Sequence, residues 1–422
     1  MYFQIIEKNK FVDDVCSSIA DETLEVAAGI IADVRARGYR AVLDCALKYK
    51  DLCENDKVIY SREDLKYLAA QLPQEKQDLL KRVARRIESF ALEQKNALTQ
   101  FSLSANGFTY GQKIIPIKRA ACYAPGGRYP LPSSVLMTAV TARAAGVEYV
   151  VVASPKPTLE TFAAAYFAGA EQFVALGGAQ VIAAFAYGAS PIEKCDIVVG
   201  PGNKYVTAAK QLVCGVIGID MLAGPSELLV VVDETSDLKL VAADLLAQAE
   251  HDADARPLVI SLDRKIPELL EAEITKQLNV LSTAETAKHA LKNSKLILVE
   301  TMEEAIEISD RIAPEHLEIM TRDADLEWHK FSSYGAIFVG ASACEVFGDY
   351  GIGPNHVLPT AAAAKFSSGL SVYNFLKTRT FITEDKSNIS GRDVIIEDTA
   401  KMAELEGLVG HRQAAMVRRT GR

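Results

Sequence analysis

The sequence predicts an α/β protein whose parallel-rich sheets are flanked by helices and divided between two domains. After about Lys118, short apolar runs rich in β-branched residues alternate with alanine-rich helical segments. Continuous apolar strands separated by helices indicate βαβ units, whose parallel sheets are buried on both faces. The chain has 422 residues and more such units than one compact sheet accommodates, so we expect two α/β domains.

The first hundred residues predict helices rather than strands. Apolar side chains between residues 24 and 34 fall on one helical face, and Gly38 is placed to end that helix. Ser61 and Asp64 have the spacing of a capping box, and Pro73 suits the first turn of a long helix. We therefore expect the sheets to begin after this helical region.

The remainder of the chain contains apolar runs with the length and composition of buried strands. They are Tyr149–Ala153, Ile197–Gly200, Leu228–Val232, Leu258–Leu262, Leu296–Val299 and Ala336–Val339. Glycine-rich turns follow several of these strands, at residues 124–127, 177–178, 200–202 and 223–225. Ligands of parallel α/β folds bind at the carboxyl ends of strands, where we expect these turns to lie. The sheet pattern stops at Thr380, and residues 397–419 predict a terminal helical arm.

Composition excludes several classes of protein. The formal net charge is −9, and no cluster of Lys and Arg forms the basic stripe that binding to a nucleic-acid backbone requires. No run is apolar for the length of a bilayer, and the N-terminal residues lack the apolar core of a secretory signal. The seven cysteines are scattered, which is typical of free thiols in a reducing compartment. We therefore expect a cytoplasmic protein with no nucleic-acid or membrane partner.

Two polar residues three positions apart form the first candidate for a metal site. Gln248 and His251 fall on one face of the helix expected after the strand Leu228–Val232. An amide oxygen and a neutral imidazole can both bind zinc, although a lone pair at this spacing does not by itself establish a site. The Gly-rich segment 348–356 is too polar to pack a core, so it indicates a functional loop in which Asp349 is the natural third ligand.

Glu315 and His316 form the candidate acid–base pair. Pro314 is expected to end the preceding helix, which places both side chains at a helix-to-strand junction, a common active-site position in α/β enzymes. A carboxylate beside an imidazole offers two proton-transfer groups of different intrinsic pKa, and the alternative is an ordinary solvent-facing pair. Glu406 and His411 lie in the terminal arm, where the alternative is a surface helix.

Several blocks of residues follow one another in a fixed order along the chain. They are Ile219 to Glu227, Gln248 to His251, Pro314 to His316, Gly348 to Tyr350, Asn355 to Thr360, and the late Glu406 and His411. Together they resemble the histidinol dehydrogenase family, and the resemblance covers nearly the whole chain. Ordered blocks of this kind are far more specific than any one motif.

The resemblance implies a zinc- and NAD-dependent oxidation of histidinol, through histidinal, to histidine, the last step of histidine biosynthesis. It implies an acid–base pair formed by Glu315 and His316. The implied zinc ligands are Gln248, His251, Asp349 and His411. The implied substrate contacts are these ligands together with His316, Ser226, His356 and Glu406. The implied NAD contacts are Tyr123, Gln180 and Asn203.

The resemblance also implies a fold of two incomplete Rossmann-like domains and an intertwined homodimer with shared active sites. The expected division has four parts. They are an N-terminal helical segment 1–17, a discontinuous first α/β domain 18–122 and 229–372, an NAD-contacting second α/β domain 123–228, and a C-terminal dimerisation arm 373–422.

The residues alone do not predict NAD binding or a unique reaction. No Gly-x-Gly-x-x-Gly with a following acidic residue is present, and the turn 200–203 is equally a phosphate site or a plain tight turn. The implied second oxidation needs a hydrated aldehyde. Because Cys122 is interpreted as a packed strand residue, we favour a water polarised by Glu315, with His316 accepting the alcohol proton. Two alternatives stay open: a dehydrogenase of the same family acting on another small polar alcohol, and a zinc hydrolase.

Overall fold

The structure, a computed structural model, describes residues 2–12, 19–53, 56–126 and 130–419, and its chain divides into two units. Unit 1 comprises Met1–Glu93 and Ile117–Phe375, and unit 2 comprises Gln94–Pro116 and Leu376–Arg422. Two positions used in the predictions, Cys16 among the cysteines and Gly127 in the first Gly-rich turn, lie outside the described residues.

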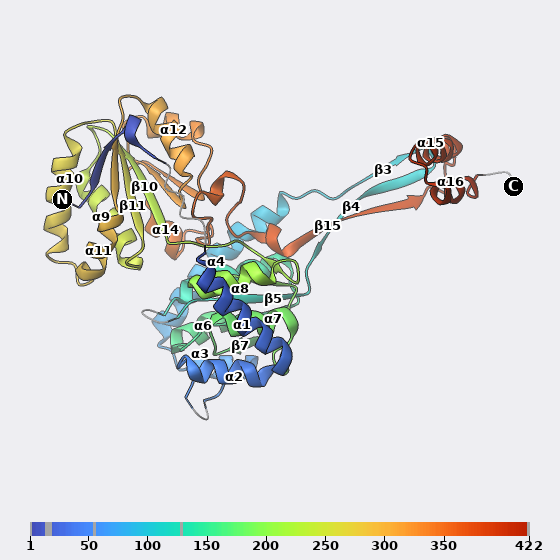
Figure 1. Ribbon diagram of the computed structural model, residues 1–422, viewed down its shortest axis with the longest axis horizontal. Helices are drawn as coiled ribbons and strands as arrows, with labels where there is room; N and C mark the ends of the chain where they lie inside the picture. Colours follow the sequence, from blue (N-terminus) through green and yellow to red (C-terminus); the bar gives the residue numbers. More distant parts are fainter. Residues whose placement is uncertain (1, 13–18, 54–55, 127–129, 420–422) are drawn as a thin grey trace. The chain divides into compact units, whose positions relative to one another are not determined.

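The first sheet of unit 1 has the strand order β2-β7-β6-β5-β8-β9. β2 pairs antiparallel to β7, and the other neighbours are parallel. The strands are β2 Ile59–Ser61, β5 Arg119–Tyr123, β6 Tyr149–Ala153, β7 Gln172–Val174, β8 Ile197–Val199 and β9 Gly218–Ile219. The helices of this region are α1 Asp21–Arg37, α2 Tyr39–Lys48, α3 Arg62–Ala69, α4 Gln74–Asn96, α5 Pro132–Ala145, α6 Leu159–Phe167, α7 Gly178–Tyr187 and α8 Lys204–Val213. Small apolar side chains of α1, α2, α7 and α8 pack against the strands, so helices cover the sheet (Figure 1).

The second sheet of unit 1 is parallel throughout, in the order β1-β12-β11-β10-β13-β14. Its strands are β1 Gln4–Glu7, β10 Glu227–Val232, β11 Arg256–Ser261, β12 Lys295–Leu298, β13 His316–Ile319 and β14 Ala336–Val339. Its helices are α9 Leu238–His251, α10 Ile266–Leu278, α11 Ala284–Ala290, α12 Met302–Ile312, α13 Ala324–Glu327 and α14 Glu345–Tyr350. Two separate apolar clusters form on its faces, because alternate side chains of β10 and β11 point to opposite sides.

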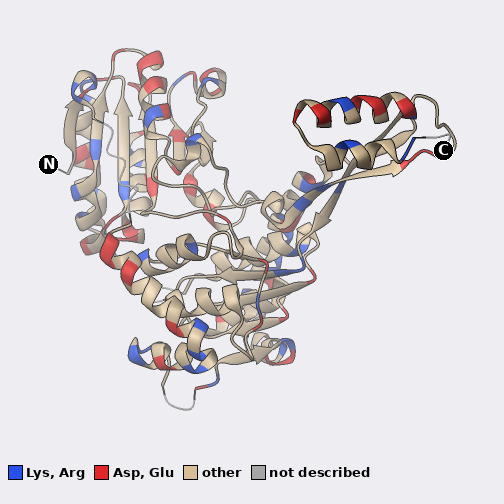
Figure 2. Cartoon of the chain, turned by 45° about the vertical axis from the view of Figure 1, so that its right-hand side comes forward, with Lys and Arg blue, Asp and Glu red and all other residues tan. Residues whose placement is uncertain are grey.

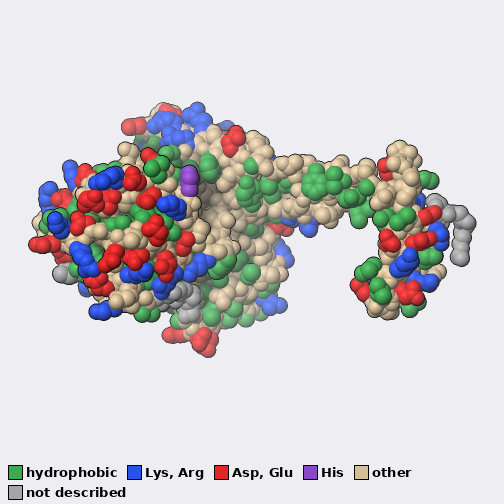
Figure 3. Space-filling view, turned by 90° about the horizontal axis from the view of Figure 1, so that it is seen from above, with side chains coloured by type: hydrophobic (Ala, Val, Ile, Leu, Met, Phe, Trp, Pro, Cys, Tyr) green, Lys and Arg blue, Asp and Glu red, His purple; other side chains and the backbone are tan. Residues whose placement is uncertain are grey.

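Unit 2 combines an antiparallel sheet with two helices. The sheet has the order β15-β4-β3, with β3 Phe101–Ala105, β4 Phe108–Pro116 and β15 Leu376–Glu384. The helices α15 Arg392–Leu405 and α16 Val409–Met416 pack against each other. Apolar side chains remain exposed along the sheet, as Figure 3 shows, and they include Phe101, Leu103, Tyr110 and Ile382.

Most predicted elements are confirmed within two residues of their bounds. The runs Tyr149–Ala153 and Ala336–Val339 coincide with β6 and β14. Gly38 ends α1 with a positive φ of 61°, a conformation that glycine adopts without strain. Ser61 and Asp64 form the capping box of α3. The charged residues gather on helices and loops, whereas the central strands carry few of them (Figure 2). No helix in the described part of the chain is long and apolar enough to cross a membrane.

The structure corrects the predicted division of the chain. Residues 4–7 form the edge strand β1 rather than a helical segment, because their backbone pairs with β12. The helices between residues 21 and 48 pack on the first sheet, so this region belongs with residues 123–228 and not with 229–372. The boundary expected at residue 122 would cut through β5, a central strand of that sheet.

The sheet pattern also does not stop at Thr380. This residue lies inside β15, and β3 and β4 form the rest of the same ribbon. The sequence concealed the ribbon because its strands are largely exposed and lack the continuous apolar run of a buried strand. The expected arm at residues 397–419 consists of two helices rather than one, with a break at residues 406–408.

Candidate active site

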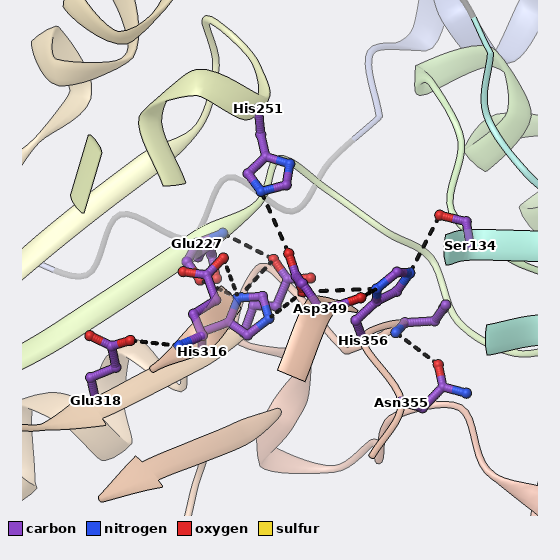
Figure 4. Close-up of polar contacts among 11 residues, drawn as sticks. Ser134, Glu227, His251, His316, Glu318, Asp349, Asn355 and His356 are labelled. Carbon is purple, nitrogen blue, oxygen red and sulfur yellow. Dashed lines mark hydrogen bonds and ion pairs between the residues drawn. The ribbon is translucent and has the colours of Figure 1, made fainter. Parts of the chain in front are cut away.

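The candidate acid–base pair, Glu315 and His316, lies at the amino end of strand β13, beside the amino end of strand β10. His316 is the first residue of β13, and Glu227 is the first residue of β10. These strands are parallel and adjacent, with Leu228 opposite His316 in the register. The prediction that the pair lies at a helix-to-strand junction is confirmed, because α12 ends at Ile312 and β13 begins at His316. The amino edge holds the site because helices α9 and α14 carry further polar residues to it (Figure 4).

His316 is buried and held by the backbone. Its Nδ1 atom lies 3.2 Å from the carbonyl oxygen of Glu227, which can only accept a hydrogen bond. Nδ1 therefore carries the proton, and Nε2 presents its lone pair. Burial lowers the pKa of His316 to about 4, although the nearby Asp349 carboxylate opposes this shift. The ring is neutral near pH 7, which is the state that can accept a proton.

Glu315 is a buried carboxyl group rather than the solvent-facing residue of the alternative reading. One of its oxygens, Oε2, accepts a hydrogen bond from the backbone N–H of Glu227 at 3.0 Å. Burial raises its pKa well above the usual carboxyl range, and the charges of Glu227 and Asp349 add to this effect. Hydrogen bonds from the Glu227 backbone and the Ser226 hydroxyl oppose the shift. The raised pKa makes Glu315 a stronger base once it is ionised.

Helices α9 and α14 bring the predicted metal ligands to the same place. His251 is the last residue of α9, and its Nε2 lies 3.7 Å from Oδ2 of Asp349 on α14. The other carboxylate oxygen of Asp349, Oδ1, lies 3.9 Å from Nε2 of His316. Gln248 stands one turn earlier on α9 and is fully buried. His251 and Asp349 therefore lie close to His316, and Gln248 lies on the same helix as His251.

His356, in the loop after α14, is a further residue of the candidate site. Its Nδ1 lies 2.9 Å from the backbone oxygen of Asp349, and its Nε2 lies 3.4 Å from the hydroxyl of Ser134 on α5 (Figure 4). The neighbouring Asn355 donates to the backbone oxygen of Met137 at 2.8 Å. These bonds fix the loop, so that His356 contacts residues of both the first and the second sheet region.

Comparison with known proteins decides the family. A family model described as histidinol dehydrogenase matches residues 17–419. The chain belongs to the histidinol dehydrogenase family. A histidinol dehydrogenase of Dechloromonas aromatica is 39% identical over 94% of this chain and 93% of its own, and one of Thermus thermophilus is 40% identical over 94% of each. The crystal structure of histidinol dehydrogenase from Elizabethkingia anophelis superimposes with a TM-score of 0.91 at 31% identity, covering 99% of this chain and 98% of that one.

The family membership makes the chain an oxidoreductase, and the α/β fold with parallel sheets agrees with that of the solved relative. The donor atoms at the site also suit the zinc ion that the resemblance implies. His251, Glu345 and Asp349 each offer a ligand atom within 4.8 Å of the others. One imidazole nitrogen with carboxylate oxygens is a donor set that zinc accepts.

The positions implied for NAD lie along the carboxyl edge of the first sheet. Tyr123 ends β5, Gln180 lies in the first turn of α7 after β7, and Asn203 is the N-cap of α8 after β8. Gly200 passes so close to Tyr123 that a Cβ at this position would collide with the tyrosine carbonyl oxygen. Asn203 uses its side-chain oxygen to cap α8, accepting from the backbone of Tyr205 at 3.0 Å.

A buried ion pair holds the same turn. The ammonium group of Lys210 on α8 contacts the carboxylate of Asp220 and donates to the backbone oxygen of Gly200 at 3.0 Å. Asp220 accepts from the Gly200 N–H at 2.6 Å. Both side chains are almost completely buried. The turn after β8 is therefore fixed on both its donor and its acceptor side, as in a well-ordered tight turn.

The two arm residues belong to unit 2. Glu406 is the C-cap of α15, and His411 lies in α16. Both are exposed. Their implied roles remain predictions.

Sequence reasoning did not identify the roles of Glu227 and Glu345 at this site. Glu227 presents its backbone to both Glu315 and His316, and such a contact leaves no mark in the sequence. Glu345 stands four residues before Asp349 on α14, a spacing that places both carboxyl groups on one helical face. That spacing is the signal that could have found it.

Proposed function

We propose that this chain catalyses the zinc-dependent, NAD-linked four-electron oxidation of L-histidinol, through L-histidinal, to L-histidine. One observation carries the proposal: a neutral histidine with a free Nε2 lies beside a set of metal-binding side chains, in a member of the histidinol dehydrogenase family. Asp349 joins the two features, because its two oxygens face His251 and His316.

The residues proposed to hold zinc are Gln248, His251 and Asp349, with His411 from the partner subunit. Zinc, when bound, supplies a template that anchors the nitrogen atoms of the substrate. Four protein ligands suit such anchoring better than the open three-ligand site of a hydrolase. Ser226, His356 and Glu406 are the further proposed substrate contacts.

NAD is the proposed hydride acceptor, held at the first sheet by Tyr123, Gln180 and Asn203. Support comes from the common edge of the first sheet on which the three positions lie. Carboxyl ends of parallel strands are where dinucleotides bind in related architectures.

The acid–base pair supplies the proton transfers of the two oxidations. His316 accepts the alcohol proton at Nε2 in the first, since its other nitrogen is already protonated. Glu315 polarises the water that adds to the aldehyde in the second, since its buried carboxylate is a strong base. A homodimer with shared sites and a cytoplasmic location complete the proposal.

The decisive experiment is NADH production by the purified protein with histidinol, before and after removal of metal by a chelator. About two NADH should form per histidinol consumed, because both oxidations occur at one site. Chelation should abolish the signal, and added zinc should restore it. One NADH per histidinol with free histidinal would contradict the four-electron reaction. Turnover of other small polyols in place of histidinol, or ester or amide cleavage without NADH, would favour the alternative substrates or the hydrolase.

A further inference from the structure

The carboxyl group of Glu345 faces the amide of Gln248 inside the protein. The hydrogen-bonding atoms of the Gln248 amide are both satisfied when its nitrogen points to Glu345. In this orientation the nitrogen donates to Oε2 at 3.1 Å and to Oε1 at 2.8 Å. Both side chains are buried, with exposures of 2% for Glu345 and 0% for Gln248. Water therefore does not compete for either group, and the orientation of the amide depends on its protein contacts.

An amide ligand has an orientation problem that imidazoles and carboxylates lack. Its two ends have nearly the same shape, but only the oxygen has a lone pair for a metal ion, whereas the nitrogen carries two protons. A group that accepts hydrogen bonds from the amide nitrogen holds the nitrogen toward itself and leaves the oxygen facing another direction. Both carboxyl oxygens of Glu345 lie within hydrogen-bond distance of the amide nitrogen of Gln248.

The helix that carries Glu345 is itself held in place. The backbone N–H of Glu345, in the first turn of α14, donates to Oε1 of Glu318 on β13 at 2.8 Å. One turn later the same helix presents Asp349 to His251. The anchored helix therefore positions one proposed ligand directly and faces the amide of another.

We propose that Glu345 is a positioning residue that holds Gln248 with its amide oxygen turned toward the metal ion. The inference rests on the proposed function, because it takes Gln248 as a zinc ligand. Contacts that orient a metal ligand in this way commonly change metal affinity by roughly 10–100-fold when they are lost.

The test is a double-mutant cycle read as zinc affinity, measured by competition with a chelator on the full-length protein. Glu345→Gln keeps the volume but replaces one acceptor by a donor, so it should weaken zinc binding about 10–100-fold. Gln248→Ala removes the ligand, and adding Glu345→Gln to it should cost nothing further. Glu303→Gln, the same change on an exposed helix position, should leave the affinity unchanged. Thermal unfolding of the metal-free proteins checks that each variant folds.

The exchange Gln248→Glu with Glu345→Gln provides a rescue. It again places an acceptor opposite a donor and puts a carboxylate at the ligand position, so it should recover much of the affinity that Glu345→Gln loses. A structural role alone predicts no such recovery, and the exchange also decides the matter if Glu345→Gln does not fold. Unchanged zinc affinity in Glu345→Gln, additive losses in the cycle, or an exchange without recovery would overturn the inference. Failure of the unaltered protein to bind zinc would instead overturn the proposed function.

Discussion

The Nδ1 atom of His316 lies 3.2 Å from the backbone carbonyl oxygen of Glu227, the first residue of the adjacent strand β10. The acceptor is a main-chain atom of a buried sheet, so no side-chain substitution removes it and the ring keeps one tautomer. The same residue donates its backbone N–H to Glu315. Glu227 thus fixes both members of the acid–base pair through its main chain.

The first prediction concerns His316. His316→Asn retains an amide N–H near the position of Nδ1 but removes Nε2, so the fold should survive without the proton acceptor. Both oxidations should slow by roughly 10²–10⁴-fold, the range for general acid–base groups, because the hydrated aldehyde must also lose a hydroxyl proton when its hydride leaves. Rates measured separately with histidinol and with histidinal would check this. A variant that retains normal rates with histidinol would contradict the role of His316.

Glu315→Gln should affect the two oxidations unequally. Only the aldehyde step needs an activated water, so it should lose roughly 10²–10⁴-fold while the alcohol step changes less. The glutamine preserves the volume and can still accept from the Glu227 N–H, which makes it a conservative probe. Single-turnover measurements from each substrate separate the steps. Equal losses in both would show that Glu315 does not act through water.

An element of the fold could be predicted only where it leaves a recognisable pattern of residues in the sequence. β6 and β10 were predictable because a buried parallel strand is a short run of apolar residues. The pair Glu315–His316 was predictable because the preceding Pro314 indicates a junction. Edge strand β1 and the exposed ribbon carry no such run, since pairing with distant strands defines them.

Contacts made by main-chain atoms also could not be predicted from the sequence. Glu227 acts on His316 by its carbonyl group, which every residue possesses. The position of the site at the amino edge of the second sheet depends on where α9 ends and α14 begins, a property of the folded chain. The helix-to-strand junction predicted for Glu315 and His316 lies at this amino edge, whereas the implied NAD positions lie at the carboxyl edge of the first sheet, where ligands of parallel folds commonly bind.

Cys122 should be dispensable for the aldehyde step. The thiol is fully buried in β5, and burial raises its pKa to about 12, so it stays protonated below that pH and is a poor nucleophile. Cys122→Ala should keep both oxidations within a few-fold of normal. Iodoacetamide at pH 8 should label the exposed Cys53 and Cys214 in the folded protein but leave Cys122 unmodified. Loss of the aldehyde step alone in Cys122→Ala would instead support a covalent thiol intermediate.

Removal of Asp349 should abolish metal binding without unfolding the chain. Its carboxylate faces both His251 and His316, whereas the two sheets are stabilised by apolar clusters that do not include it. Asp349→Ala should therefore lose zinc, measured by elemental analysis after gel filtration, together with its activity, and retain its circular dichroism spectrum. Asp252→Asn, next to the end of α9 and exposed, is the matched control and should keep its zinc. Full activity in metal-free Asp349→Ala would overturn the role of zinc.

The last prediction is that two chains share each active site. His411 belongs to unit 2, whereas the other proposed zinc ligands belong to unit 1. The helices of unit 2 leave apolar side chains exposed, including Leu405 at 82% and Val409 at 74%, and a second subunit would cover such a surface.

If His411 completes the site of the partner subunit, an inactive His411→Ala chain and an inactive His316→Ala chain should restore activity when they are co-expressed. In a mixed dimer one site carries both changes and the other carries neither. Random pairing makes half of the dimers mixed, so about a quarter of the normal number of sites should recover.

The control pairs His411→Ala with Glu406→Ala, since two arm changes damage both sites of a mixed dimer and should restore nothing. If mixed dimers isolated by two different affinity tags stay inactive in the first pairing, His411 acts within its own chain, and the shared site is wrong.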